Sequence, residues 1–354
     1  FSLVILNYGV AAYLLRLVDY ARTRKRSICP EFYLALGFVV LTSFMLLRLA
    51  SGQERELAFR AAVVQPDIPQ DEKWDDAFNR KILNRLELQT LSLAALEPDA
   101  AFWPEASLPY PLNDDGSMEN WAVRIANELG ASIFAGALGI ERREGGLDWY
   151  NSVFLVQPEL GLFPKYYSKR HLVPFGEYIP LRPLWPWIEK VVPISGDILS
   201  GESVSLLPLQ TGTTTIRIGS LICFEDVFPR LARSSVREGA GALYVATNSA
   251  WYGHSGASRQ HMAHSVMRAV ENRRVTLRVG NDGLTCWIDE YGNVRAELSP
   301  WEQEWTTWEI TRDRRWVGKL TSYAKYGDWF VWCCWGALAA SYFAAPLFAQ
   351  ERQI

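Results

Sequence analysis

Three side chains that lie far apart in the sequence have the types that covalent catalysis by a thiol requires. Cys223 follows an apolar run in the stretch SLICFEDVF (220–228), with Glu225 and Asp226 close behind it. Burial and nearby negative charge both raise the pKa of a thiol, so Cys223 on its own would be an inert core residue. A nucleophilic Cys223 needs a proton acceptor and a positive charge from elsewhere in the chain.

Two other segments supply such groups. Glu105 ends the apolar stretch DAAFWPE, and Lys169 lies in YYSKRHLVPFGEYIP (166–180), a loop stiffened by prolines that also holds Glu177. Because side chains at the ends of neighbouring strands meet at one edge of a sheet, we expect Glu105, Lys169 and Cys223 to converge in one crevice. There Glu105 would accept the thiol proton and Lys169 would offset the negative charge.

The elements that position these groups alternate as in mixed α/β proteins. The pattern of apolar and polar residues predicts strands at 59–65, 99–105, 131–138, 150–157, 203–209, 214–223, 241–247, 275–280, 284–290, 293–298 and 305–310. It predicts helices at 75–96, 117–129, 228–238 and 257–274. In the last of these helices Met262, Val266, Ala269 and Val270 share one face, which we expect to pack in the core.

Apolar stretches near both ends of the chain are long enough to cross a bilayer. These stretches are 1–15, 32–50 and 329–349. Between the first two lies a loop with four basic residues within 22–26, which the positive-inside rule places in the cytoplasm. The second span would then carry the chain to the outer side of the cytoplasmic membrane.

These spans predict three regions. They are N-terminal membrane helices in 1–55, a catalytic domain in 56–315 outside the cytoplasmic membrane, and a C-terminal membrane helix in 316–354. The sequence opens on Phe1 without a methionine, and we expect a fragment that begins inside a membrane helix.

Composition argues against several other classes of protein. The 354 residues carry a formal net charge of −3 and show no basic stripe, so we expect no nucleic-acid partner. The five cysteines are odd in number and lack metal or disulfide spacing, and the four histidines form no ligand pattern. We therefore expect no metal and no cofactor, and we expect Cys223 and Cys286 to stay unpaired.

Around the three candidate residues the chain resembles the nitrilase superfamily of carbon–nitrogen hydrolases, whose catalytic set is Glu-Lys-Cys. The stretches HLVPFGE (171–177) and TNSAWYG (247–253), together with the flanking spans, resemble the apolipoprotein N-acyltransferases within it. The resemblance covers about residues 55–330 and the C-terminal span, and it implies an α/β fold with a nitrilase-like αββα sandwich flanked by transmembrane helices. The chain departs from the family at Phe224, where tyrosine is common, and in its short N-terminal membrane portion.

The resemblance also assigns roles to residues. It makes Glu105 the general base, Lys169 the lysine that stabilises an oxyanion, and Cys223 the nucleophile. It makes Glu177 a second acidic residue and places Trp74 near the entrance of the active site.

The remaining candidate residues are assigned less directly, and some of them have two interpretations. The backbone N–H of Phe224 would donate to the oxyanion beside Lys169. Glu225 either orients that lysine or, like its neighbour Asp226, provides negative charge at a helix N-terminus. The apolar stretch 181–194, with Trp251 and Tyr252, is either an interfacial lid over the substrate or a long loop packed on the domain.

The function implied by the resemblance is acyl transfer in the bacterial inner membrane. The acyl chain would pass from a phospholipid to a thioester on Cys223, and then to the α-amine of a diacylglyceryl-cysteine at the N-terminus of a lipoprotein. One alternative is a membrane-tethered amidase that hydrolyses a small amide with the same residues. Another is a binding domain without catalysis on a membrane anchor. The apolar lid and the several spans favour the acyltransferase.

Overall fold

The computed structural model of the chain describes residues 2–24, 29–144, 146–181, 197–212, 214–336 and 338–339. The chain forms two compact units, 1–54 and 55–354.

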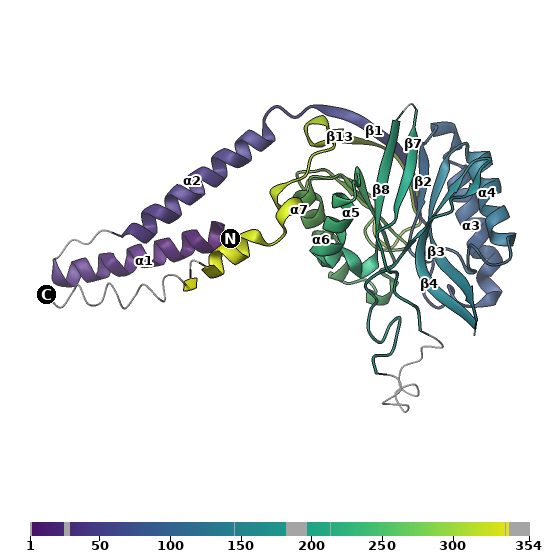
Figure 1. Cartoon of the computed structure of the whole chain (residues 1–354), viewed down its shortest axis with the longest axis horizontal. Helices are drawn as coiled ribbons and strands as arrows, with labels where there is room; N and C mark the ends of the chain where they lie inside the picture. Colours follow the sequence, from purple (N-terminus) through teal and green to yellow (C-terminus); the bar gives the residue numbers. More distant parts are fainter. Residues whose placement is uncertain are drawn as a thin grey trace. The chain divides into compact units, whose positions relative to one another are not determined.

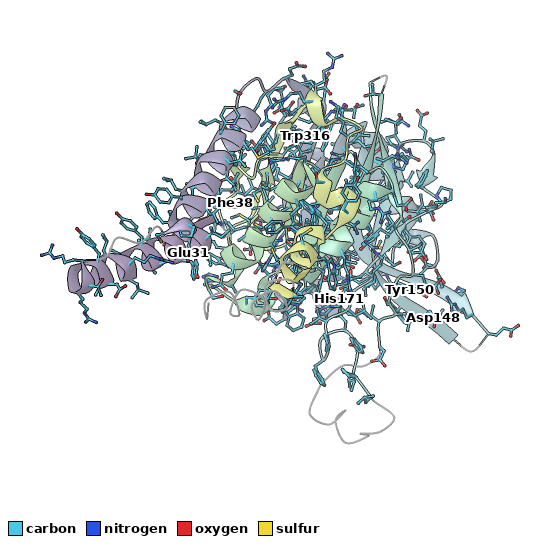
Figure 2. The ribbon with its side chains drawn as sticks, turned by 60° about the vertical axis from the view of Figure 1, so that its left-hand side comes forward. Glu31, Phe38, Asp148, Tyr150, His171 and Trp316 are labelled. Atoms are coloured by element: carbon cyan, nitrogen blue, oxygen red, sulfur yellow. The ribbon has the colours of Figure 1, made fainter. Side chains whose placement is uncertain are left out.

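The first unit consists of two helices, α1 (Ser2–Thr23) and α2 (Pro30–Ala50). The windows Val4–Thr23 and Pro30–Leu47 are long and apolar enough to cross a membrane. Figure 2 labels Glu31 and Phe38 on α2. The helix α1 continues without a break past the apolar stretch 1–15 to Thr23.

Two β-sheets stacked between helices form the second unit (Figure 1). The first sheet has the order β13-β1-β2-β3-β4-β5, with β6 also paired to β4. Its strands are β1 (Arg55–Gln65), β2 (Ala100–Trp103), β3 (Ser132–Arg143), β4 (Gly146–Gln157), β5 (Gly161–Leu162), β6 (Tyr167–Ser168) and β13 (Glu304–Asp313). The β3–β4 hairpin, which carries Asp148 and Tyr150, projects from the sandwich in Figure 2.

The second sheet has the order β12-β11-β10-β9-β8-β7. Its strands are β7 (Leu206–Thr211), β8 (Thr214–Ile222), β9 (Ala242–Thr247), β10 (Thr276–Gly280), β11 (Cys286–Ile288) and β12 (Val294–Glu297). The longer helices of this unit are α3 (Asn79–Leu91), α4 (Ser117–Leu129), α5 (Pro229–Arg237) and α6 (Ala257–Asn272). Shorter helical segments are η1 (Asp76–Phe78), η2 (Ala94–Leu96), η5 (Cys223–Val227), η6 (Ala250–Tyr252), η7 (Arg314–Trp316) and α7 (Ser322–Tyr326).

The apolar runs of the central strands follow from burial on both faces. In β1, Ala61 and Val63 enter the core between the two sheets, whereas Ala62 and Val64 pack in the layer with α3 and α4. On the second sheet, α5 packs on β8 and β9 in a separate cluster. A strand that is covered on both faces has a continuous run of apolar residues, whereas a strand with one face in solvent alternates apolar and polar residues. This arrangement confirms the predicted αββα sandwich.

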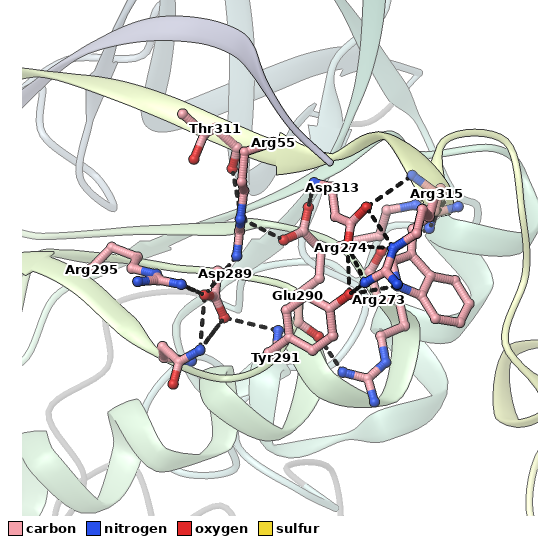
Figure 3. A network of polar contacts seen from close by, with 12 residues as sticks. Arg55, Arg273, Arg274, Asp289, Glu290, Tyr291, Arg295, Thr311, Asp313 and Arg315 are labelled. Atoms are coloured by element: carbon pink, nitrogen blue, oxygen red, sulfur yellow. Dashed lines mark hydrogen bonds and ion pairs between the residues drawn. The ribbon is translucent and has the colours of Figure 1, made fainter. Parts of the chain in front are cut away.

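A network of charged residues ties the two sheets together at one end (Figure 3). Arg55, the first residue of β1, donates to Asp289 at 2.9 Å and to Glu290 at 3.1 Å, and both carboxylates follow β11 of the other sheet. Asp289 is also bound by Arg295 at 2.7 Å. Because Asp289 and Glu290 are almost fully buried, these ion pairs are shielded from the solvent that weakens surface pairs.

Several boundaries differ from those expected. The predicted helix 75–96 is divided into η1, α3 and η2, and the predicted strand 214–223 ends at Ile222. The proposed lid at 181–194 lies, after its first residue, outside the described residues. Most of the predicted C-terminal span lies outside them as well, but residues 329–336 are helical and expose Trp329, Trp332 and Trp335.

Candidate active site

Cys223 occupies a strained turn at the carboxyl end of β8. Its φ is 52°, in the left-handed region, and the segment Cys223–Val227 continues as η5. For a residue with a Cβ this conformation costs roughly 1–2 kcal/mol. The turn takes the chain abruptly out of the sheet, and the thiol lies in the wall of a cavity. Sequence reasoning placed Cys223 at the end of a strand but gave no indication of this turn.

Buried polar contacts hold the turn in place. Glu225 accepts a hydrogen bond from the Ile222 N–H at 2.8 Å, and His261 Nε2 lies 3.2 Å from the Cys223 carbonyl oxygen and 2.8 Å from Asp226 Oδ1. Arg278 donates to His261 Nδ1 at 3.1 Å and to Asp226 Oδ2 at 2.9 Å. Since a guanidinium only donates, Nδ1 must accept, and Nε2 carries the hydrogen that faces the Cys223 carbonyl.

Burial of Asp226 alone would raise its pKa, but the hydrogen bond from His261 and the charge of Arg278 outweigh burial and lower it. Asp226 therefore stays ionised between His261 and Arg278. Asp226 lies in the first turn of η5, as the interpretation of a charge at a helix N-terminus expects, and it is fully buried there.

Glu105 reaches the same cavity from the loop after β2. The loop crosses β3 at Gly136, where a Cβ would collide with the Pro104 carbonyl oxygen. Ser107 completes the crossing, because its backbone N–H and its hydroxyl both donate to the Gly136 carbonyl, at 2.7 and 2.9 Å. Only glycine allows this close approach of the two backbones.

Lys169 comes directly after β6. Its backbone N–H donates to the Asn151 carbonyl on β4 at 2.8 Å, and its own carbonyl accepts from Gly201 at 2.8 Å. The side chain is 1% exposed, and its Nζ lies 2.8 Å from Glu177 Oε1 and 3.4 Å from Glu105 Oε1. The Asn151 side chain bridges the two carboxylates by donating at 2.8 Å to Glu105 and at 3.1 Å to Glu177.

The electrostatics of this cluster set the chemistry that it allows. Burial and the adjacent carboxylate of Glu105 raise the pKa of the Cys223 thiol to about 12, although Lys169 acts in the opposite direction. Burial would lower the pKa of Lys169, but Glu105, Cys223 and Glu177 together raise it, so the ammonium stays charged. Glu105 and the thiol line the same cavity, and Glu105 acts directly on the pKa of the thiol. Cys223 can therefore act as a nucleophile by passing its proton to Glu105 during the attack.

A cavity of about 510 Å³ opens over these groups. Its lining includes Glu105, Lys169, Glu177 and Cys223 together with Asn151, Asn248, Val173, Phe175, Phe224, Trp74, Trp251 and Tyr252. Much of the wall is apolar, and several aromatic side chains remain open to solvent: Trp74 is 52%, Phe175 50% and Trp251 70% exposed. The cavity thus combines a buried polar floor with an exposed apolar mouth.

Glu225 contacts the segment around Lys169 and not the lysine ammonium directly. It accepts hydrogen bonds from the backbone N–H groups of Arg170 and His171, at 2.7 and 3.0 Å, and from the Tyr167 hydroxyl at 2.6 Å. Burial raises the pKa of Glu225 despite these donors. The carboxyl therefore fixes the backbone just after Lys169 and the side chain of Tyr167 before it, while Glu177 contacts the ammonium itself.

Sequence reasoning missed three polar residues of the site, namely Asn151, His261 and Lys73. Asn151 interrupts an apolar strand, which is a usable signal for a functional side chain. His261 belongs to a buried polar stripe on α6 with the helical spacing Ser258, His261, Ser265, Arg268 and Asn272. The expected apolar face of this helix is present only as a small cluster of Met262, Val266 and Ala269 with β11 residues. Lys73 lies in a polar run that gives no sign of burial.

Comparisons with known proteins agree with this geometry. The family model for carbon–nitrogen hydrolases matches residues 60–315. Proteins named apolipoprotein N-acyltransferase are similar to this chain: one from Geobacter metallireducens is 34% identical over 86% of the chain and 58% of the relative, and one from Nitrosomonas europaea is 30% identical over 87% and 59%. The chain thus spans little more than half the length of these relatives.

Solved structures show the same fold. Nit3 of Saccharomyces cerevisiae, a member of the nitrilase superfamily, matches with a TM-score of 0.53 at 18% identity and covers 74% of this chain and 93% of that one. The Nesterenkonia AN1 amidase also gives a TM-score of 0.53, at 15% identity, over 79% of this chain and 100% of that one. The predicted resemblance is confirmed: the matched region holds all but the first residues of the sandwich and every residue that lines the cavity, and this chain belongs to the carbon–nitrogen hydrolase family.

Proposed function

We propose that this chain transfers an acyl group from a phospholipid to the α-amine of a diacylglyceryl-cysteine at the N-terminus of a lipoprotein, through a thioester on Cys223. The observation that carries the proposal is the cavity, which sets Cys223, Glu105 and Lys169 below a mouth of exposed aromatic side chains. An acyl donor with long alkyl chains needs such a mouth, whereas a small soluble amide does not. The names of the similar proteins support the same reaction.

In the first half-reaction the Cys223 sulfur attacks the ester carbonyl of the phospholipid, and Glu105 accepts the thiol proton. Lys169 and the Phe224 backbone N–H donate to the oxyanion of the tetrahedral intermediate. When the intermediate collapses, the ester C–O bond breaks, and Glu105 returns the proton to the leaving lysophospholipid oxygen. The acyl group is now bound to sulfur. Throughout the reaction, Glu177 keeps the Lys169 ammonium in place and Asn151 keeps the Glu105 carboxylate in place.

In the second half-reaction the neutral α-amine of the acceptor attacks the thioester carbonyl. A C–N bond forms and the C–S bond breaks, while Glu105 takes a proton from the amine nitrogen and delivers it to the departing Cys223 sulfur. The products are an N-acylated lipoprotein and the original thiol. Because the thioester is buried beside Glu105, any water that entered would be activated in the same way, and the apolar mouth keeps water out.

The proposed setting is the bacterial cytoplasmic membrane. We divide the chain into membrane helices at 1–55, a catalytic domain at 56–315 and a C-terminal membrane helix at 316–354, with the catalytic domain on the outer face. Two features support this arrangement: α1 and α2 are long and apolar enough to span a bilayer, and basic residues cluster between them. In such a setting Trp74, Phe175, Trp251 and Tyr252 would meet acyl chains that leave the bilayer.

The test follows the acyl group in two steps. The chain in nanodiscs is incubated with a phospholipid labelled in its acyl chains, and intact-mass analysis then looks for one acyl adduct that maps to Cys223. A peptide with an N-terminal diacylglyceryl-cysteine is added next, and the label should move to its amine. If the thioester releases free fatty acid and never acylates the peptide, the reaction is hydrolysis and not acyl transfer. If no adduct forms on Cys223, the proposal is refuted.

A further inference from the structure

Lys73 is a second buried ammonium beside the reacting groups. Its side chain is 2% exposed, and its Nζ donates to the backbone carbonyl oxygen of Glu105 at 3.0 Å. An ammonium has three N–H donors, and among the described residues this carbonyl is the one acceptor found for it. Burial disfavours the charged form of a lysine unless nearby negative charge offsets the lost hydration.

The segment that carries Lys73 is fixed to the second sheet. Asn281, just after β10, accepts from the Ile68 N–H at 3.1 Å and donates to the Ile68 carbonyl at 2.8 Å, and its own carbonyl accepts from the Asp67 N–H at 2.7 Å. A turn from Pro69 to Lys73 closes with a backbone hydrogen bond of 3.1 Å. The position of Lys73 is thus set by hydrogen bonds to the backbone of its own segment and not by its side chain.

The charges facing Lys73 come from three elements. They are Glu105 after β2, Asp282 after β10 and the thiol of Cys223 at the start of η5. Burial lowers the pKa of Lys73 to about 8, and the negative charges of Glu105 and Asp282, with the ionised form of Cys223, limit the fall. Lys73 is therefore mainly charged at neutral pH and loses its proton in mildly alkaline solution.

We propose that Lys73 is a positioning and electrostatic residue of this active site, which fixes the Glu105 segment through its carbonyl and stabilises negative charge on the Cys223 sulfur. This inference deepens the proposed function, but it concerns the reactivity of the thiol before any acyl substrate binds. Lys169 favours the ionised thiol but is shared with the carboxylates of Glu105 and Glu177, so Lys73 adds a second positive charge as the thiol proton moves to Glu105.

Two properties distinguish the proposed role of Lys73 from that of a lysine that only packs: its dependence on positive charge and its dependence on pH. A lysine that only packs should be replaceable by a methionine of similar volume. A lysine that acts by charge should tolerate arginine better than methionine, and arginine keeps its charge at alkaline pH. Lys81 provides a matched control, because it lies close by in sequence, is half exposed and pairs with Glu72 at 2.9 Å on the surface.

The experiment measures alkylation of Cys223 by iodoacetamide in the full chain in nanodiscs, from pH 6.5 to 9.5, by peptide mass spectrometry. Lys73→Met should slow alkylation at pH 7 about tenfold, since a rise of one unit in the thiol pKa removes nine-tenths of the thiolate. Lys81→Met should leave the rate unchanged. The wild-type pH profile should bend downward near pH 8, where Lys73 loses its proton, and Lys73→Arg should lack this bend.

Each outcome decides the proposal. A Lys73→Met rate within twofold of wild type at pH 7 overturns it, and so does an equal loss in Lys73→Arg and Lys73→Met, which would mean packing alone. If Lys73→Met does not fold, the wild-type profile decides, because the absence of a bend between pH 7 and 9 overturns the charge role. Since iodoacetamide needs no acyl donor, failure of the acyl-transfer proposal would leave this result intact.

Discussion

Replacement of Lys169 by methionine tests the centre of the site, because it removes the ammonium while nearly preserving its volume. In the structure this charge lies 2.8 Å from Glu177 and 3.4 Å from Glu105, and the side chain is almost fully buried. At an effective dielectric constant of about 20, unit charges 3.4 Å apart attract each other by about 5 kcal/mol, most of which offsets desolvation. The change therefore leaves two close carboxylates without their shared counter-charge.

Two effects should follow from Lys169→Met. Loss of one oxyanion donor raises the barrier by about 3–4 kcal/mol, which slows formation of the acyl-enzyme by roughly 10²–10³-fold. Breaking a buried ion pair also lowers the free energy of unfolding by about 3–5 kcal/mol. The first is measured by single-turnover acylation with labelled phospholipid, and the second by chemical denaturation.

Lys165 gives the control for this measurement. It lies in the same segment but is exposed, so Lys165→Met should cost less than about tenfold, as expected for a screened surface charge. Acylation that survives Lys169→Met but fails in Lys165→Met would show that the wrong lysine has been placed at the oxyanion. Equal, small losses in both variants would refute the oxyanion role itself.

Three further predictions concern the thiols and their support. Cys223→Ala and Cys223→Ser should fold normally but give no thioester by intact-mass analysis, because alanine has no nucleophile and a serine hydroxyl is a much poorer nucleophile and leaving group than a thiol; wild-type turnover by the alanine variant would exclude Cys223 as the nucleophile. Thiol counting after non-reducing denaturation should find both Cys223 and Cys286 free, as the structure has them, and a protected pair would contradict this. His261→Ala should leave the Cys223 carbonyl without its donor and remove one of the groups that hold Asp226, lowering stability by about 1–3 kcal/mol, and His261→Gln should recover part of the acylation rate that His261→Ala loses.

The fold was predictable because its signals are local. Strands such as β9 and β10 are short apolar runs bounded by turns, and α4 begins and ends where the periodicity of the sequence predicts. The helix at 75–96 was less well predicted, since its first turn and its last are 3₁₀ segments on either side of α3. Neither of these two segments buries a residue, so no apolar pattern in the sequence marks where α3 begins and ends.

The site was only partly predictable, for a related reason. Glu105 and Cys223 stand at strand ends, where position in the sequence indicates position in space. Lys169 follows a strand of two residues, so its assignment depended on the family resemblance. The burial of Lys73 could not be predicted, because a lysine among acidic residues is usually exposed to solvent. Its burial depends on the contacts of Asn281 with the segment before it, which the local sequence does not indicate. The turn at Cys223 could not be found either, because a cysteine with positive φ has no signature in composition.

The crossing at Gly136 has a consequence for how this sequence can vary. Any side chain there would push the Pro104–Glu105 backbone off β3, and the carboxylate would move away from the thiol with it. A lineage can lose this glycine only if the loop after β2 changes its length or its path at the same time. Position 136 should therefore co-vary with insertions or deletions near residues 104–107 in relatives that keep the Glu-Lys-Cys set. In relatives that have lost the set, the glycine should drift freely.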